Sequence, residues 1–132
     1  MKVLVDSTIW SLVLRRTRPD TAMASLLESL MLDGRVAIIG PIRQEVLSGI
    51  KERAHFEWLR DHLQTFPDTE IISADYEEAA AFYNECRRKG IEGSQIDLLI
   101  CAVAVRNEFA IFTTDGDFAH YAKLLPITLY DS

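Results

Sequence analysis

Short apolar runs alternate with longer stretches of helical periodicity along this chain of 132 residues. Five runs rich in β-branched or aromatic residues predict β-strands. These predicted strands cover residues 2–5, 35–39, 70–72, 110–112 and 126–129. Because helical stretches separate consecutive strands, the strands are expected to pair in parallel, with helices covering both faces. The pattern therefore predicts an α/β fold with a mostly parallel sheet of about five strands flanked by helices.

The predicted helices are marked by apolar spacing and by residues that start or stop a helix. Residues 21–32 carry apolar side chains three and four positions apart, and Asp33-Gly34 follows as a stop signal. Asp75 and Ser94 are suited to capping the helices that follow them. The other predicted helices begin after Asp6, open at Pro41 and stop at Gly49, and cover residues 52–64, 76–89, 95–106 and 118–123.

Length and composition predict a single domain over residues 1–132. The chain is 48% hydrophobic, which is enough for a substantial core at this size. No repeat, low-complexity tract or linker rich in Gly, Ser and Pro divides it. The first apolar run meets a charge at Asp6, too soon for a signal peptide or a membrane span. A cytoplasmic protein that does not enter a membrane is therefore expected.

The formal net charge of −6 argues against a protein that holds nucleic acid mainly by neutralising phosphates. It does not exclude an enzyme that acts on nucleic acid. If acidic residues bind divalent cations, the cations become the positive charges that meet phosphate, and the local sign of the charge reverses.

Several acidic residues lie where the predicted alternation would bring them to one edge of the sheet; they are Asp6, Glu45, Asp97, Asp115 and Asp117. Ligands of open parallel sheets bind at this edge, beyond the carboxyl ends of the strands. Neighbouring carboxylates cannot all stay ionised without a compensating charge. Mg²⁺ and Mn²⁺ favour oxygen ligands, and two such ions roughly 3.5–4 Å apart suit phosphodiester hydrolysis. The acids therefore indicate a divalent metal site.

Each acid also has an ordinary structural explanation. Asp97 follows Ser94 by three residues, a spacing close to a capping box. Glu45 lies about one turn into a predicted helix, where the helix dipole favours a carboxylate. Asp6 and Asp117 are each suited to capping a following helix. These separate explanations do not account for carboxylates from four segments at one sheet edge.

A receiver-like phospho-acceptor signalling module, which is not a nuclease, is an alternative from another class. Such modules also carry acids at the ends of parallel strands. They are expected to have two adjacent acids after the first strand and a lysine near the end of the last one. This chain has Asp6-Ser7 at the first position and no lysine within residues 126–129.

A haloacid-dehalogenase-like phosphatase is a second alternative, with Asp6 as the nucleophile and Thr8 two residues later. It would need a later catalytic lysine and usually a larger chain. Neither alternative explains Glu45 and Asp97 together.

Two motifs and two isolated acids resemble a known family. The motifs are Asp6-Ser7-Thr8-Ile9-Trp10 and Thr113-Thr114-Asp115-Gly116-Asp117-Phe118. The isolated acids are Glu45 and Asp97, the latter on an apolar helix. In this order and at these separations, the set resembles a PIN domain. Across nearly its whole length the chain is similar to VapC-type toxins of bacterial toxin-antitoxin pairs.

The resemblance implies an Mg²⁺- or Mn²⁺-dependent endoribonuclease, the toxin of a type II VapBC system. It would hydrolyse RNA phosphodiester bonds with a metal-activated water, leaving a 5′-phosphate and a 3′-hydroxyl. The implied catalytic residues are Asp6, Glu45, Asp97 and Asp115, and the implied metal ligands are Asp6, Asp97, Asp115 and Asp117. Ser7 and Thr113 match hydroxyl positions beside the acids, where they could orient a ligand.

The resemblance also implies partners. A VapB-type antitoxin is expected to place a tail in the acidic groove, often with a basic side chain, and the net charge of −6 suits such a partner. A homodimer is expected as well. Candidates for contact with the RNA substrate are Arg15, Arg16 and Arg43. For Arg15 and Arg16, a purely solvated surface charge explains the residues equally well.

Overall fold

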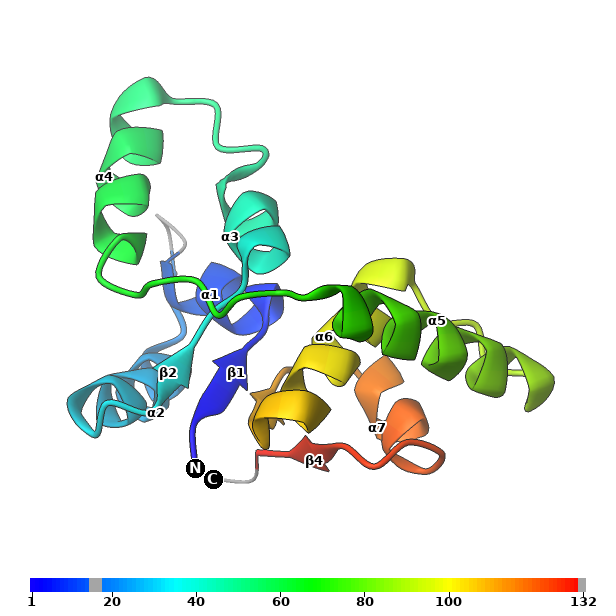
Figure 1. The fold of residues 1–132 in the computed structure, drawn as a ribbon. Helices are drawn as coiled ribbons and strands as arrows, with labels where there is room; N and C mark the ends of the chain where they lie inside the picture. The colour runs from blue at the N-terminus through cyan, green and yellow to red at the C-terminus, as the bar shows by residue number, and fades with distance from the viewer. Residues whose placement is uncertain (15–17, 131–132) are drawn as a thin grey trace.

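The computed structural model describes residues 1–14 and 18–130 (Figure 1). Within these residues the sheet contains four strands, β1 (Val3–Val5), β2 (Val36–Ala37), β3 (Ala110–Phe112) and β4 (Thr128–Leu129). Their order is β2-β1-β3-β4, and every neighbouring pair is parallel. The predicted α/β fold with a parallel sheet is confirmed.

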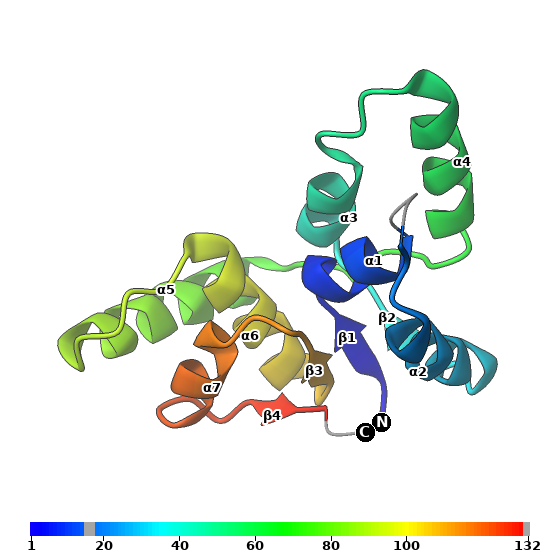
Figure 2. The same ribbon diagram turned by 180° about the vertical axis from the view of Figure 1, so that it is seen from behind.

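Helices flank the sheet on both sides of its central strands. They are α1 (Ser7–Leu14), α2 (Thr21–Leu32), α3 (Gly40–Leu47), α4 (Arg53–Leu63), α5 (Ser73–Arg88), α6 (Gln95–Asn107) and α7 (Asp117–Ala122). Figures 1 and 2 show α2 beside β2, α7 beside β4, and α5 packed along α6. No helix within the described ranges is long and apolar enough to cross a membrane.

The helix boundaries follow local signals in the sequence. Helix α2 covers the predicted residues, and Asp20 caps it by accepting a hydrogen bond from the Met23 N–H at 3.0 Å. Gly34 follows with a φ of +66°, a left-handed conformation that glycine adopts without a steric penalty. Ser94 caps α6 as predicted, because its hydroxyl accepts from the Asp97 N–H.

Strand β1 and helix α6 form the centre of the core. All residues of β1 are fully buried, and residues 98–104 of α6 are buried as well. Trp10 of α1 is 1% exposed, and its indole N–H donates to the Val5 carbonyl at 3.1 Å. The core therefore anchors β1, which ends just before Asp6, and α6, which carries Asp97 in its first turn.

The predicted strand at residues 70–72 is wrong. A single bridge between Ile38 and Asp68, with a hydrogen bond from the Thr69 N–H to the Ile38 carbonyl at 2.8 Å, extends the sheet beyond β2. After this bridge the chain leaves the sheet and enters α5 at Ser73. The described sheet therefore has four strands and not about five.

Side chains take the backbone polar groups that a fifth strand would have paired. Arg106 of α6 donates from Nη2 to the Glu70 carbonyl at 2.8 Å, and Asp75 Oδ2 accepts from the Ile72 N–H at 3.0 Å. Asp75 was predicted to precede its helix, but α5 begins at Ser73, so Asp75 caps it from within the first turn. This arrangement gives both backbone groups a hydrogen-bond partner without a neighbouring strand.

Asp75 and Arg106 also form an ion pair that joins the start of α5 to the end of α6. The Asp75 side chain is 1% exposed and the Arg106 side chain 36%. Nε lies 2.7 Å from Oδ1, and Nη2 lies 2.9 Å from Oδ2. Burial alone would raise the pKa of Asp75, but the hydrogen bonds from Arg106 and the Ile72 N–H lower it below its usual value.

Candidate active site

Asp6 follows β1 directly, and its carboxylate is buried at the carboxyl end of the sheet. The residue is 4% exposed. Oδ1 accepts from the Ser7 N–H at 2.8 Å, and Oδ2 accepts from the hydroxyls of Thr8 at 3.2 Å and Thr113 at 2.7 Å. These donors satisfy the carboxylate oxygens, as burial of a charged group requires, and hold the side chain in one orientation.

Thr8 and Thr113 join the first turn of α1 to the turn after β3. Their hydroxyl oxygens lie 3.3 Å apart, and both reach Oδ2 of Asp6. The Thr8 hydroxyl also accepts from the Thr114 N–H at 3.2 Å, and the Thr113 hydroxyl accepts from the Asp115 N–H at 3.0 Å. Side chains therefore connect the start of α1 to the turn after β3, in addition to the pairing of β1 with β3.

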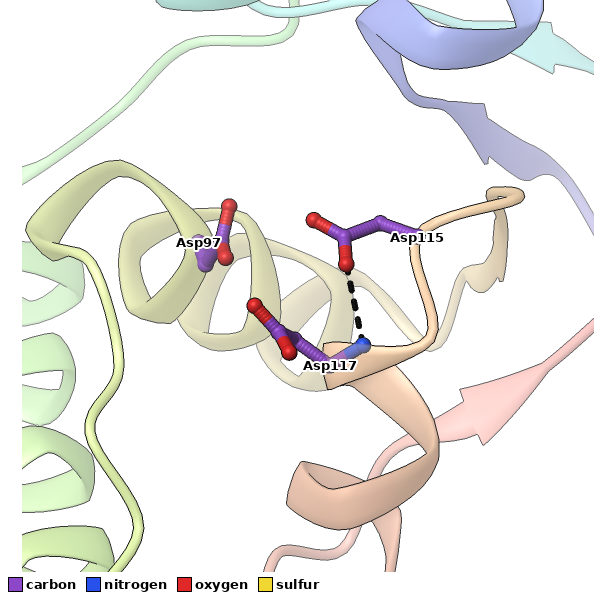
Figure 3. A group of neighbouring side chains, drawn as sticks. All are labelled: Asp97, Asp115 and Asp117. Carbon is purple, nitrogen blue, oxygen red and sulfur yellow. Dashed lines mark hydrogen bonds between the residues drawn. The ribbon is translucent and has the colours of Figure 1, made fainter.

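Asp97, Asp115 and Asp117 point toward one another (Figure 3). One carboxylate oxygen from each lies within 4.8 Å of those from the other two. Asp97 lies in the first turn of α6, Asp115 in the turn after β3, and Asp117 at the start of α7. The Asp117 N–H donates to Oδ1 of Asp115 at 2.9 Å, which fixes these two residues relative to each other. We call these three acids the acidic cluster.

Asp97 is half-buried and is held by Tyr121. The Tyr121 hydroxyl donates to Asp97 Oδ2 at 2.9 Å. Burial raises the pKa of Asp97, hydrogen bonds from Tyr121 and Ser94 lower it, and the charges of Asp115 and Asp6 raise it; the net shift is upward. A raised pKa is the behaviour expected of a carboxylate that lacks a compensating positive charge.

Glu45 lies on α3 at the exposed rim of the site and is connected to it through Ser7. The Ser7 hydroxyl donates to Oε1 of Glu45, while the Ser7 N–H donates to Asp6. Neither Glu45 nor Asp6 is among the three acids whose oxygens gather within 4.8 Å. The structure thus brings part of the predicted acidic set together and places the remainder beside it, so the individual catalytic and metal-binding roles stay predictions.

The acidic cluster fits a divalent cation that prefers oxygen ligands. Among residues 1–14 and 18–130, no lysine, arginine or histidine forms an ion pair with an acid of this site. Carboxylates this close to one another must share protons or bind a cation. Mg²⁺ is commonly held by a few carboxylates while it keeps several waters. Asp97, Asp115 and Asp117 therefore form a suitable set of ligands.

Arg43 lies two residues before Glu45, but its guanidinium binds residues that follow α4 or end it. Nε donates to Asp68 Oδ1 at 3.0 Å, and the terminal nitrogens donate to backbone carbonyls at and just beyond the end of α4. These bonds give Arg43 a structural task, and its contact with RNA stays a prediction. Arg15 and Arg16 lie outside the described residues.

Sequence reasoning missed Tyr121, and it gave Thr8 a role only in the phosphatase alternative. Tyr121 lies four residues after Asp117, a spacing that places both side chains on one helix face. That spacing was the available signal. Thr8 follows Asp6 by two residues, within reach of its carboxylate, but nothing in the sequence indicates that it also accepts from the Thr114 N–H.

Replacement of Thr113 by valine is expected to lower the free energy of unfolding by about 2 kcal/mol. Valine keeps the shape but removes a donor to the buried Asp6, and a hydrogen bond to a charged group contributes about 1.5–3 kcal/mol. Urea titration at pH 7 measures the difference. Thr128→Val, at an exposed position of β4, is the matched control. Equal losses in the two variants would contradict the role given to the Thr113 hydroxyl.

The chain is similar to proteins of a known family. Residues 3–124 match the family described as PIN domain. Ribonuclease VapC11 of Mycobacterium tuberculosis (strain H37Rv) and VapC ribonuclease Mb1587 of Mycobacterium bovis are each 29% identical to this chain over 126 residues, covering 92% of this chain and 92% of each relative.

Solved structures show the same fold. VapBC2 from Rickettsia felis, bound to a DNA fragment from its promoter, has a TM-score of 0.80 at 19% identity, covering 100% of this chain and 99% of that one. FitAcB from Neisseria gonorrhoeae has a TM-score of 0.79 at 18% identity, covering 98% and 96%. Because the family match spans residues 3–124, nearly the whole sequence, the chain belongs to the PIN domain family.

Proposed function

We propose that this protein is an Mg²⁺- or Mn²⁺-dependent endoribonuclease and the toxin of a type II VapBC toxin-antitoxin pair, with residues 1–132 forming one PIN domain. The observation that carries the proposal is the acidic cluster, in which oxygens from three carboxylates lie within 4.8 Å without an ion-pair partner among the described residues. The two mycobacterial relatives, both named as VapC ribonucleases, support it.

The proposed reaction is hydrolysis of an RNA phosphodiester bond, with a 5′-phosphate and a 3′-hydroxyl as products. A bound divalent cation would supply positive charge for the phosphate and increase the acidity of the attacking water. Asp97, Asp115 and Asp117 would hold it. Asp6, which Thr8 and Thr113 orient, would be the fourth ligand.

The remaining acid has a different position. Glu45 is exposed at the rim, and the Ser7 hydroxyl restrains one of its oxygens. An exposed carboxylate there can accept a proton from the attacking water, so no covalent nucleophile is required from the protein.

The acidic cluster also suits a basic partner. We propose that a VapB-type antitoxin covers it, since structures of similar fold are described as VapBC and FitAB assemblies. A basic side chain placed among the uncompensated carboxylates would be attracted by them. RNA as the substrate, a homodimer and a cytoplasmic location belong to the same proposal. The receiver-like alternative is not favoured, because the PIN domain match covers residues 3–124.

Conditional expression of the unsubstituted chain in bacteria, followed by mapping of RNA 5′-phosphate ends, tests the proposal. We expect growth arrest and discrete new ends with the unsubstituted chain, and neither with Asp97→Asn. Identical ends from both chains would show that the acidic cluster does not cut RNA in that host. Absence of new ends from a folded, expressed chain would count equally against the proposal.

A further inference from the structure

Tyr121 is fully buried, yet its hydroxyl reaches an acid of the acidic cluster. Its oxygen donates to Asp97 Oδ2 at 2.9 Å. Tyr121 lies on α7, four residues after Asp117, so this helix carries one acid of the acidic cluster and the hydrogen-bond donor to another. Between the described residues of α6 and α7, this is the one side-chain hydrogen bond. It therefore connects the two helices at the point where their acids meet.

Packing fixes the position of the Tyr121 ring. Phe118 contacts it edge-on, with ring centroids 5.2 Å apart and an interplanar angle of 76°. The loop before α6 packs close to the same ring at Gly93. A Cβ on Gly93 would lie 3.4 Å from Tyr121 Cε1 and 2.3 Å from Leu98 Cδ2. The ring has little room to move, so the position of the hydroxyl is set by the core and not by the solvent.

Asp97 is the member of the acidic cluster that most needs such a constraint. Asp115 and Asp117 lie two residues apart and share a hydrogen bond. Asp97 comes from a different helix, and repulsion from the other two carboxylates favours rotation of its side chain away from them. The hydrogen bond from Tyr121 opposes that rotation.

We propose that Tyr121 is a positioning residue for the metal site: its hydroxyl holds the Asp97 carboxylate where it can share one divalent cation with Asp115 and Asp117. The inference rests on the metal site of the proposed function. Hydrogen-bonding partners of metal ligands typically contribute about 10–100-fold in metal affinity. Tyr121 therefore sets how tightly the cation is held and does not take part in the chemical step.

The test is Mn²⁺ binding by isothermal titration calorimetry to the metal-free full chain and to Tyr121→Phe. Phenylalanine keeps the ring and removes the hydroxyl. We expect the dissociation constant for Mn²⁺ to rise by about 10-fold or more. The Mn²⁺ concentration that gives half-maximal RNA cleavage should rise by the same factor, while the rate at saturating Mn²⁺ returns close to that of the unsubstituted chain.

Tyr83→Phe is the matched control. It removes a tyrosine hydroxyl that accepts from Arg87 Nη1 at 3.2 Å on α5, outside the acidic cluster. Its Mn²⁺ affinity should equal that of the unsubstituted chain. Thermal unfolding of each metal-free variant verifies that it is folded.

Equal Mn²⁺ affinity in folded Tyr121→Phe and in the unsubstituted chain would overturn the inference while leaving the proposed nuclease intact. Loss of affinity in a chain that cuts no RNA would support the inference and count against the nuclease. If the unsubstituted chain binds no Mn²⁺, both proposals fail.

Discussion

Asp97→Asn is expected to reduce RNA cleavage by more than about 100-fold, beyond the loss typical of residues that only support a ligand. Asparagine keeps the shape of the side chain and can still accept the hydrogen bond from Tyr121. It removes a negative charge from the cluster of three acids that the structure brings within 4.8 Å. Cleavage of a labelled RNA at fixed Mn²⁺ concentration measures the effect.

The same substitution should stabilise the metal-free protein at pH 7. The pKa of Asp97 is raised in the folded state, so its ionisation opposes folding at pH values above that pKa. As the pH falls toward the ordinary carboxyl value of 3.8, the group becomes protonated and the cost disappears. The stability difference between the variant and the unsubstituted chain should therefore shrink on acidification.

Saturating Mn²⁺ should reverse the order of stability at pH 7, because the unsubstituted chain would bind the ion more tightly in its folded state. Asp61→Asn is the matched control, since it makes the same chemical change at an exposed residue whose ion pair with Arg60 contributes little. Full cleavage by Asp97→Asn would contradict the role of Asp97. A variant that unfolds more readily than the unsubstituted chain without metal would contradict the electrostatic argument.

Arg106→Met is expected to lower the free energy of unfolding by about 3 kcal/mol at pH 7, the lower end of the range for breaking a buried ion pair, because the arginine end is partly exposed. Methionine retains the apolar stem but leaves the buried carboxylate of Asp75 with the Ile72 N–H and without its cation. Replacement of the other partner, Asp75→Asn, should lower the free energy of unfolding by only about 1–2 kcal/mol, because the released guanidinium can turn to water. The asymmetry follows from the difference in burial of the two partners.

The pH dependence of this ion pair has the opposite sign to that of Asp97. The pKa of Asp75 is lowered in the folded state, so its stabilising contribution is present above the unfolded value and is lost as the pH falls through the folded pKa, below 3.8. Urea unfolding of Arg106→Met and the unsubstituted chain should differ most at neutral pH and converge in acid. Arg88→Met, which breaks an exposed ion pair with Glu85, should change stability by no more than about 0.5 kcal/mol. If Arg106→Met lowered the free energy of unfolding as little as Arg88→Met does, the prediction would be contradicted.

Most of the fold could be predicted from the sequence because local pattern and burial agree. The apolar run at 3–5 forms β1, and the apolar stretch at 98–104 is the buried part of α6. The error at residues 70–72 has a non-local cause. Strand formation there would have required backbone partners, and a side chain from the distant α6, Arg106, takes the Glu70 carbonyl instead.

The candidate site could be predicted only at the level of which segments supply acids. Parallel strands place the ends of β1 and β3 at one edge, and this rule located Asp6 and Asp115. It does not say which carboxylate oxygens converge, because that depends on how α6 packs against α7. Nor does it show that Tyr121, on an otherwise ordinary short helix, directs its hydroxyl to Asp97.

The loop between β3 and α7 is ordered by hydrogen bonds to side chains, two of them its own and one from α1. The N–H groups of Thr114, Asp115 and Asp117 each donate to a side-chain oxygen, supplied by Thr8, Thr113 and Asp115. The conformational entropy of this segment, about 1–2 kcal/mol for each residue backbone, is therefore lost when the protein folds and not when a ligand binds. A cation that binds there meets ligands in place and need not order the loop, so more of its interaction energy remains as affinity.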